Sequence, residues 1–341
     1  MTRVRSSHSG ESLNMPLVSV IIPVYNGERT IRETLESVLN QTFQDFEVII
    51  INDGSQDTTL EVINSIQDLR LNVFSYPNGG QGASRNRGLS HASGQYIAFL
   101  DADDLWTDDK LEKQLQALEQ NPEAVLAYSW TNYIDESSKF LYRGASIIVN
   151  GDAYPRLLLT DFLENGSNPL IRREILLDIG NFDESLPPAE DWDLWLRIAS
   201  RYHFVTVAKA QILYRISAGS SSSNVVKMES SCLKVIDRAF DEAPESLQYL
   251  KRDSLANIYK YLTYKSLFGV PDRSKGFIAT RFILFAIYYD YSLLRKRVFL
   301  KVFLKIAISV IIPHQQAQKL ITKMNRLSNI YTLMGTCRSD P

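Results

Sequence analysis

Short apolar runs alternate with helical stretches between residues 17 and 104, and this alternation constrains the fold more than any other feature. The runs at residues 18–24, 46–51, 72–76 and 96–100 have the length and composition of buried strands. The stretches at 28–39, 57–66 and 83–90 separate them and carry helical patterns. Because such repeats form right-handed crossovers, the sequence predicts an α/β fold with a doubly wound parallel sheet covered on both faces.

Polar and acidic residues follow several of these predicted strands. Tyr25 and Asn26 follow the first strand, Asp53 the second, residues 78–87 the third and residues 101–104 the fourth. Ligands of open α/β sheets bind beyond the carboxyl ends of the strands. Carboxylates gathered there repel one another unless a cation compensates them, so we expect a site for a metal and a nucleotide.

Three common nucleotide or hydrolase motifs are missing. The first strand runs into Pro-Val-Tyr-Asn-Gly at residues 23–27 instead of a G-x-G-x-x-G turn, and the glycines of residues 79–82 follow the third strand with the wrong spacing. The sequence also lacks a Walker A motif and a Gly-x-Ser-x-Gly elbow. These absences argue against a dinucleotide-binding dehydrogenase, a phosphate-loop hydrolase and a serine hydrolase.

An Asp-Ala-Asp-Asp sequence ends the fourth predicted strand. In an extended segment Asp101 and Asp103 project to the same side, with Asp104 next in line. Such carboxylates can hold a hard cation, Mn²⁺ or Mg²⁺, together with diphosphate oxygens. The alternative is that these residues only cap a helix that begins near Thr107.

Six motifs in order carry a resemblance to a known family. They are residues 18–26 (VSVIIPVYN), 51–57 (INDGSQD), 82–88 (GASRNRG), 99–104 (FLDADD), 180–184 (GNFDE) and 190–195 (EDWDLW). Together they resemble the bacterial-type family 2 glycosyltransferases, over about residues 17–225. The resemblance implies a GT-A fold, a nucleotide-diphospho-sugar donor and an inverting transfer.

The resemblance also implies a role for each matching residue. The nucleotide-binding positions are Pro23, Tyr25 and Asn26 around the base, with Glu28 just behind them, Asp53 as acceptor of a hydrogen bond from the base, Arg85 in the same pocket, and Asp101 beside the ribose. Asp103 corresponds to the metal ligand, and Asp101 is the second candidate ligand of the metal. Asp191 corresponds to the general base, supported by Glu190.

One position departs from the family pattern. Relatives often carry Tyr-Arg-x-His after the last core strand, whereas residues 214–217 here place Ser217 at the histidine position. Arg215 remains as a candidate ligand of the diphosphate. The serines at 220–223 suggest either a loop that closes over the donor or a plain flexible linker.

The chemistry implied is a single displacement, in which a base acts on the acceptor hydroxyl opposite the leaving diphosphate. Asp191 precedes a helical pattern, and a helix N-terminus favours the ionised carboxylate. We expect a uridine diphosphate donor by default, and a glycan or lipid-linked glycan acceptor bound by residues 130–180, including Trp130, Tyr133 and Asn168. The alternatives are a sugar-nucleotide nucleotidyltransferase and a non-catalytic binding module of the same fold.

The C-terminal part differs in composition. Residues 251–341 carry many more Lys and Arg than Asp, and the apolar segments 277–294 and 298–312 are interrupted by charges. Neither reaches the ~20 uninterrupted apolar residues of a spanning helix. With Arg295-Lys296-Arg297 between them, they suggest helices in the interface of an anionic membrane. A bundle packed on the catalytic domain and a partner-binding helix are the alternatives, and a nucleic-acid partner is not expected because no reader motif occurs.

These observations divide the chain into three parts. We expect a disordered lead-in at residues 1–16, a catalytic domain at 17–225 and a basic, mainly helical region at 226–341. Within the catalytic domain, residues 17–104 would bind the nucleotide and residues 105–225 the acceptor. Cys232 and Cys337 have no disulfide or zinc spacing, and residues 1–14 lack an apolar signal core, so we expect a cytoplasmic protein, peripheral on the inner face of the membrane.

Overall fold

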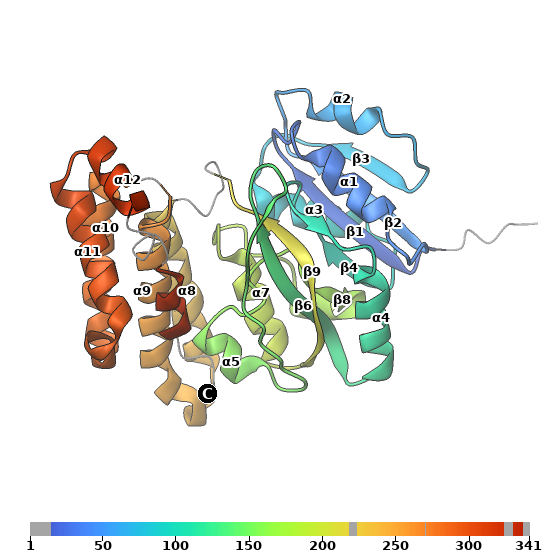
Figure 1. Ribbon diagram of the computed structural model, residues 1–341. Coiled ribbons are helices and arrows are strands. Elements are labelled where there is room, and N and C mark those ends of the chain that lie inside the picture. Colours follow the sequence, from blue (N-terminus) through green and yellow to red (C-terminus); the bar gives the residue numbers. More distant parts are fainter. Residues whose placement is uncertain (1–14, 218–223, 270, 324–329, 337–341) are drawn as a thin grey trace, which may run out of the picture.

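The computed structural model describes residues 15–217, 224–269, 271–323 and 330–336. The predicted lead-in at residues 1–14 and the serines at 220–223 lie outside these ranges. Among the described residues, nine strands form one mixed sheet with the order β3-β2-β1-β4-β8-β6-β9-β5, and β7 pairs with β6. The sheet and the helices that cover it confirm the predicted α/β class (Figure 1).

The first four strands are the predicted parallel half of the sheet. They are β1 (Val18–Val24), β2 (Phe46–Asn52), β3 (Leu71–Ser75) and β4 (Tyr96–Phe99). Every residue of β1 is buried, because β1 lies between β2 and β4 and helices cover both of its faces. Its side chains alternate between two hydrophobic cores: Val18, Val20 and Ile22 enter one, and Ile21 enters the other.

The remaining strands are added in mixed directions. They are β5 (Leu105–Trp106), β6 (Ala124–Ile134), β7 (Phe140–Arg143), β8 (Leu170–Arg172) and β9 (His203–Arg215). Strand β8 pairs antiparallel with both β4 and β6, and thereby joins the two halves. Strands β6 and β9 run parallel to each other, and their long pairing places Tyr133 and Tyr214 side by side.

The helices between the first strands are α1 (Ile31–Leu39), α2 (Thr59–Asn64), α3 (Gln81–His91) and, after β5, α4 (Lys110–Gln120). Helices α1 and α2 begin later than predicted, because the residues before them tie the two loops together. The Glu28 amide donates to Asp57 at 3.2 Å, and the Thr58 amide donates to Glu28 at 3.1 Å. Glu28 therefore has a structural partner behind the β1 loop.

The second half of the catalytic domain contains three helices: α5 (Tyr154–Leu159), α6 (Arg173–Ile179) and α7 (Glu190–Ala199). The C-terminal region is helical, as predicted. It contains α8 (Val225–Glu242), η2 (Glu245–Leu250), α9 (Lys251–Ser266), α10 (Arg273–Tyr289), η3 (Tyr291–Arg295), α11 (Arg297–Ile311), α12 (His314–Lys323) and η4 (Tyr331–Thr336). Within the described ranges, none of these helices combines the length and apolarity needed to cross a bilayer.

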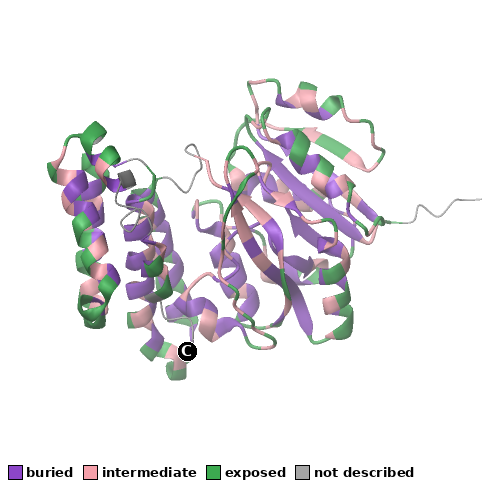
Figure 2. Cartoon of the chain, in the orientation of Figure 1, coloured by how far each residue is buried: buried purple, intermediate pink, exposed green. Residues whose placement is uncertain are grey.

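The C-terminal helices are arranged in two layers beside the sheet (Figure 1). Helices α8 and α9 pack against α5 and α7 and share one hydrophobic core with them, as the bundle alternative predicted. Helices α10 and α11 form the outer layer, farthest from the sheet. In Figure 2 buried positions dominate α9 and form one face of α8, whereas exposed positions run along α10 and α11. The domain boundary at residue 225 stays a proposal, since the shared core continues across it.

Candidate functional site

A single cavity of about 620 Å³ collects most of the predicted catalytic residues. It lies where β4 ends, between the sheet, helix α7 and the C-terminal helix α9. The motif residues that line it are Gln81, Arg85, Asp101, Asp103, Glu190 and Asp191. Residues more than a hundred positions apart in the sequence therefore face one space. Two of the predicted acidic groups meet there, whereas Asp53, which was expected at the same site, does not line the cavity.

Arg85 connects the two acidic clusters. It sits in α3 and is only 2% exposed, so it is not a solvated helix residue. Its Nη2 donates to Asp101 Oδ1 at 2.8 Å, and its Nη1 lies 3.4 Å from Glu190 Oε1. Burial opposes the charge, but the nearby carboxylates outweigh it and raise the pKa of Arg85 above its usual range. The cation is thus fixed between the two clusters.

The position of Arg85 depends on a close approach by the backbone of Gly166. A Cβ atom at residue 166 would lie 2.4 Å from Arg85 Nη2, which is closer than real Cβ contacts come. Only glycine leaves room for the guanidinium there. The loop that precedes β8 is therefore part of the site, although no sequence motif marks it.

The Asp-Ala-Asp-Asp segment is a turn, not an extended strand end. The Asp104 amide donates to the Asp101 carbonyl at 3.0 Å, and this bond closes the turn. The turn nevertheless brings both Asp101 and Asp103 to the cavity. Asp104 does not follow them, contrary to the prediction, because its buried carboxylate accepts bonds from Ser167 Oγ at 2.6 Å and the Arg215 amide at 3.0 Å. Helix α4 begins at Lys110, so these residues do not cap it.

Asp101 and Asp103 fit a divalent cation. Burial and the charge of Asp101 raise the pKa of Asp103 to about 6, so positive charge at this place would stabilise the ionised form. The described residues contain no cluster of three His, Cys, Asp or Glu side chains that could hold a metal. Mg²⁺ is usually held by one or two carboxylates together with substrate phosphates and water. The two aspartates match that pattern, which needs a diphosphate to complete it.

None of the predicted nucleobase residues lines the cavity: Tyr25 and Asn26 lie in the loop after β1, and Pro23 lies within β1 itself. Tyr25 is half exposed, and Asn26 has a left-handed backbone with φ of 50°. Pro23 is held within β1 opposite Ile51. The Asn26 side chain accepts a bond from the Gln56 amide at 2.8 Å, which ties the two loops together. These residues form an ordered surface beside the cavity.

Asp53 is already engaged by protein donors. Its two carboxylate oxygens accept the amides of Gly79 and Gly80, each at 2.8 Å, and Arg87 Nη1 lies 2.9 Å away. The side chain is almost fully buried. Asp53 therefore shapes the glycine turn before α3, and this places Arg85 by setting where the helix begins.

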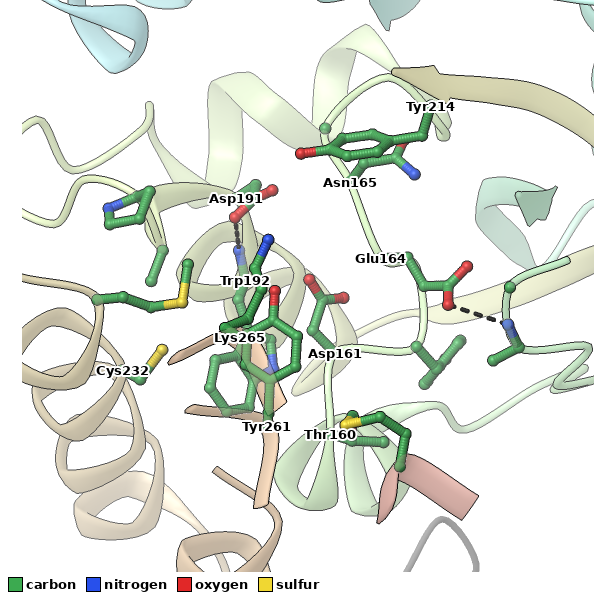
Figure 3. Close-up of a pocket in the computed structure, with 18 of the residues that line it drawn as sticks. Thr160, Asp161, Glu164, Asn165, Asp191, Trp192, Tyr214, Cys232, Tyr261 and Lys265 are labelled. Atoms are coloured by element: carbon green, nitrogen blue, oxygen red, sulfur yellow. Dashed lines mark hydrogen bonds between the residues drawn. The ribbon is translucent and has the colours of Figure 1, made fainter. Parts of the chain in front are cut away.

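Glu190 and Asp191 occupy the first turn of α7, as the sequence predicted. Burial raises the pKa of Asp191, an effect that Arg85 partly offsets, and burial likewise raises the pKa of Glu190 to about 7. Asp191 accepts a bond from the Trp192 amide at 2.8 Å (Figure 3). A carboxylate with a raised pKa is a better proton acceptor than an ordinary one. The pair is therefore suited to base chemistry.

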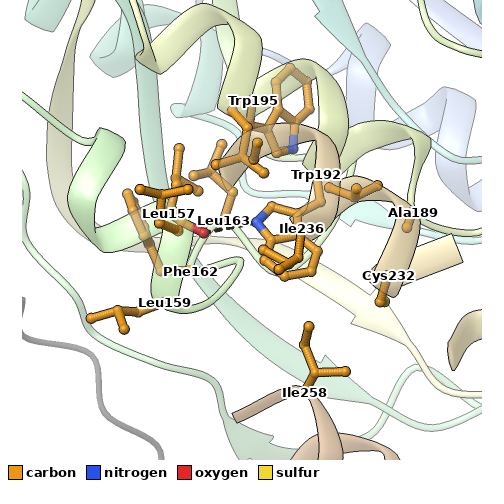
Figure 4. Packing of buried hydrophobic residues seen from close by; sticks show 14 of the residues in the cluster. Leu157, Leu159, Phe162, Leu163, Ala189, Trp192, Trp195, Cys232, Ile236 and Ile258 are labelled. Carbon is orange, nitrogen blue, oxygen red and sulfur yellow. Dashed lines mark hydrogen bonds between the residues drawn. The ribbon is translucent and has the colours of Figure 1, made fainter. Parts of the chain in front are cut away.

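The two tryptophans of α7 hold this turn in place. Trp195 is fully buried, as expected for a core residue. Trp192 donates from its indole nitrogen to the Leu157 carbonyl at 3.0 Å and also borders the cavity. Figure 4 shows Trp192 packed among Leu157, Ile236 and Ile258, so helices α5, α8 and α9 together support the helix that carries Asp191.

Arg215 has a different role from the one predicted. Its guanidinium donates to the Asp103 carbonyl at 2.7 Å, to Ser138 Oγ at 2.9 Å and to Glu33 Oε2 at 2.9 Å. The side chain is buried and does not line the cavity. Because every guanidinium nitrogen already donates to a protein oxygen, Arg215 fixes the turn at Asp103 instead of offering donors to a diphosphate.

The expected acceptor residues are only partly at the cavity. Tyr133 lines it, but Trp130 does not, and Asn168 bonds the backbone of Ser129 and Leu163 in the interior. The predicted range 130–180 covered Asp161, Glu164 and Asn165, in the loop after α5, without singling them out. It missed Tyr261 and Lys265 in α9. One pattern in the sequence could have indicated them: Asn257, Tyr261 and Lys265 are four residues apart and therefore lie on one helical face.

Comparisons with known proteins agree with this arrangement. A family model described as "Glycosyltransferase like family 2" matches residues 19–266. The chain is 36% identical over 230 residues to the Escherichia coli UDP-Glc:alpha-D-GlcNAc-diphosphoundecaprenol beta-1,3-glucosyltransferase WfaP, a match that covers 65% of this chain and 87% of that protein. Matches to uncharacterized glycosyltransferases of Rickettsia bellii and Rickettsia felis cover 27% and 34% of those proteins, so the chain spans about a third or less of their length.

Two solved structures share the fold. The Staphylococcus aureus TarS fragment 1–349 in complex with UDP-GlcNAc aligns with a TM-score of 0.53 at 19% identity, covering 94% of this chain and 90% of that one. The mannosyltransferase PcManGT from Pyrobaculum calidifontis, in complex with GDP-Man and Mn²⁺, aligns with a TM-score of 0.56 at 16% identity, covering 95% and 89%. Both similarities extend into the C-terminal helices, because each covers well over nine tenths of this chain.

Proposed function

The chain belongs to the glycosyltransferase-like family 2, and on this premise we propose that it transfers a sugar from a nucleotide-diphosphate donor to a hydroxyl of a glycan or lipid-linked glycan. One observation carries the proposal: a single cavity joins the Asp101–Asp103 turn to the Glu190–Asp191 pair through Arg85. Donor-side and acceptor-side chemistry need this proximity.

The relatives suggest which substrates to test. The name of WfaP contains UDP-Glc and a diphosphoundecaprenol-linked acceptor, and TarS was solved with UDP-GlcNAc. We propose a UDP-sugar as the first donor candidate and a lipid-linked glycan as the first acceptor candidate. Tyr25, Asn26 and Asp53, on the loops beside the cavity, would contact the nucleobase, and Pro23 and Glu28 would hold those loops in place.

The mechanism follows from the placement of the carboxylates. Asp191 would take the proton of the acceptor hydroxyl, so that the hydroxyl oxygen attacks the anomeric carbon opposite the leaving diphosphate. One displacement of this kind inverts the anomeric centre. Glu190 would support Asp191 by holding Arg85, whose charge also keeps Asp101 in place. Asp101 and Asp103 would hold a Mn²⁺ or Mg²⁺ ion, which when bound supplies positive charge to the leaving diphosphate.

Nucleotide binding is the first test. Calorimetry and thermal unfolding with UDP, GDP, TDP and CMP, each with and without Mn²⁺ or Mg²⁺, should show one nucleotide that binds in a metal-dependent way. A ligand at a hundred times its Kd should add about 2.7 kcal/mol to the free energy of unfolding. Binding without any transfer to acceptors would favour the non-catalytic module, and no response to any nucleotide would contradict the proposal.

We also propose that the outer C-terminal helices rest on an anionic membrane, which would place the protein at the inner face of the cell membrane. Large apolar side chains are exposed along α10 and α11, including Leu284, Tyr288, Leu300 and Phe303. The three residues Arg295–Arg297 between these helices are also exposed. An apolar face next to basic residues suits an interface with anionic lipid. Lys305 of α11 does not belong to this exposed surface, because its side chain is buried.

Vesicle binding tests this surface. The double variant Leu300→Glu/Phe303→Glu should sediment with phosphatidylglycerol-containing vesicles at least about tenfold less than the wild type, since it replaces apolar area with negative charge. Leu69→Glu is the matched control, because Leu69 is fully exposed in the loop between α2 and β3, outside the outer helices. Equal sedimentation of all three proteins would remove the membrane proposal without affecting the transferase proposal.

A further inference from the structure

One wall of the cavity comes from the C-terminal region instead of the motif-bearing part of the chain. Helix α9 contributes Asn257, Ile258, Tyr261, Tyr264 and Lys265 to the lining. These positions recur every three or four residues, so they form one continuous face of the helix. The face that α9 turns to the cavity is thus distinct from the face on which Tyr259 stacks against Phe285 of α10, at 4.8 Å between ring centroids.

The rings around this wall form a connected aromatic surface. Tyr133 and Tyr142 from the sheet stack at 4.6 Å, and Tyr142 lies 5.3 Å from Tyr331 of η4. The hydroxyl groups of Tyr142 and Tyr264 lie 3.4 Å apart. Tyrosine offers a flat apolar face together with a polar edge, and this combination suits a ring that is apolar on its faces and carries hydroxyl groups around its rim.

Polar groups in the loop between α5 and β8 face the same space. Asn165 is 3% exposed, and its side-chain amide donates to Thr131 Oγ1 at 3.0 Å. Its carbonyl oxygen Oδ1 is buried and has no hydrogen-bond partner among the described residues. Leaving a buried acceptor unsatisfied costs free energy, so a ligand hydroxyl that donates to it would be favoured.

Asp161 connects this region to the proposed base. Burial, reinforced by the charge of Asp191, raises the pKa of Asp161 far above its ordinary value, so the two carboxyl groups influence each other across the cavity. In Figure 3 the side chains of Asp161, Tyr261 and Lys265 point into the space that Asp191 also faces. A hydroxyl-bearing ligand on this wall would therefore lie next to the group that must take its proton.

We propose that the cavity face of α9, together with Asp161 and Asn165, binds the acceptor saccharide and selects it. This inference rests on the transferase function proposed above and assigns the acceptor subsite to a wall built largely by the C-terminal region. Arg85 joins Asp101 of the donor motifs to Glu190. In Figure 3 Tyr261 and Lys265 of α9 face the same space as Asp191, the proposed base. Tyr261 is a specificity-determining residue in this arrangement.

The test compares two tyrosines of the same helix. Tyr261→Phe and Tyr261→Ala alter the cavity wall, whereas the matched control Tyr259→Phe removes a hydroxyl from the face that meets α10. An extract of the source cells is divided into an organic phase, which contains lipid-linked glycans, and an aqueous phase, which contains free glycans. Each protein is incubated with each phase and with radiolabelled UDP-glucose or UDP-GlcNAc. The label identifies which phase contains the acceptor. The Kd of UDP with Mn²⁺ is measured in parallel.

We expect Tyr261→Phe to need about three to ten times more extract for half-maximal labelling, as the loss of one hydrogen bond implies, and Tyr261→Ala to need more still. Both variants should bind UDP within about twofold of wild type, and Tyr259→Phe should match wild type in both measurements. Unchanged extract dependence for both Tyr261 variants, or an equal loss of UDP affinity, would overturn the inference. A wild-type protein that labels neither phase would instead contradict the proposed transfer from a UDP-sugar, independently of the α9 wall.

Discussion

Asp191→Asn is expected to lower transfer to the acceptor by about 10²–10⁴-fold, the usual contribution of a general base, while donor binding persists. Asparagine keeps the shape of the side chain and can still accept the amide bond from Trp192. It cannot take a proton from the acceptor hydroxyl. The loss should therefore appear in kcat and not in the Kd of the nucleotide.

Asp193→Asn provides the matched control for this variant. Asp193 is two residues further along α7 and pairs with Arg197 and Arg238 instead of lining the cavity. Its replacement should lower the melting temperature but leave kcat close to the wild-type value at a temperature where the protein is folded. If Asp191→Asn turned over at the wild-type rate, Asp191 would not be the base, and Glu190 would be the next candidate.

Asp103→Asn is expected to abolish metal-dependent nucleotide binding and, at the same time, to stabilise the ligand-free protein at pH 8. The pKa of Asp103 is raised from 3.8 to about 6 by burial and by Asp101, so the folded protein favours its neutral form. The stability linked to this group is present at acidic pH and is lost as the pH rises through about 6. An amide removes the penalty, a gain of about 3 kcal/mol at pH 8 given 1.36 kcal/mol per pKa unit.

Thermal unfolding at pH 5 and pH 8, with and without Mn²⁺ and UDP, measures both effects. The difference between wild type and Asp103→Asn should be roughly half as large at pH 5 as at pH 8, because pH 5 lies between the unfolded pKa of 3.8 and the folded pKa of about 6. Asp109→Asn should instead lower the melting temperature to a similar extent at both pH values, because Lys209 lies 2.6 Å from Asp109 and the pKa of that carboxyl is lowered below 3.8. Metal-dependent binding of UDP by Asp103→Asn at wild-type affinity would remove Asp103 as a metal ligand.

Local patterns in the sequence predicted much of the fold. The strands β1 to β4 and the start of α7 lie within a residue or two of their predicted positions, since each is encoded by the periodicity of neighbouring residues. The order of six motifs indicated the family, and the family model confirmed it. Helices α1 and α2 began late because their first turns are occupied by bonds between two loops, which no single segment encodes.

The roles of Asp104, Arg215 and α9 depended on tertiary contacts. Asp104 and Asp103 are neighbours in sequence, yet a turn sends one carboxylate to Ser167 and the other to the cavity. In the sequence Arg215 resembles a diphosphate ligand, but in the folded protein its guanidinium donates to Ser138 and Glu33.

The sequence by itself therefore determined the alternating α/β architecture, the family and the positions of the acidic motifs, because periodicity and motif spacing are properties of nearby residues. Only the tertiary structure decided which of those acids share a cavity, which arginine joins them and which C-terminal helix completes the wall. Burial and charge proximity set these features, and both arise between residues that are far apart in the chain.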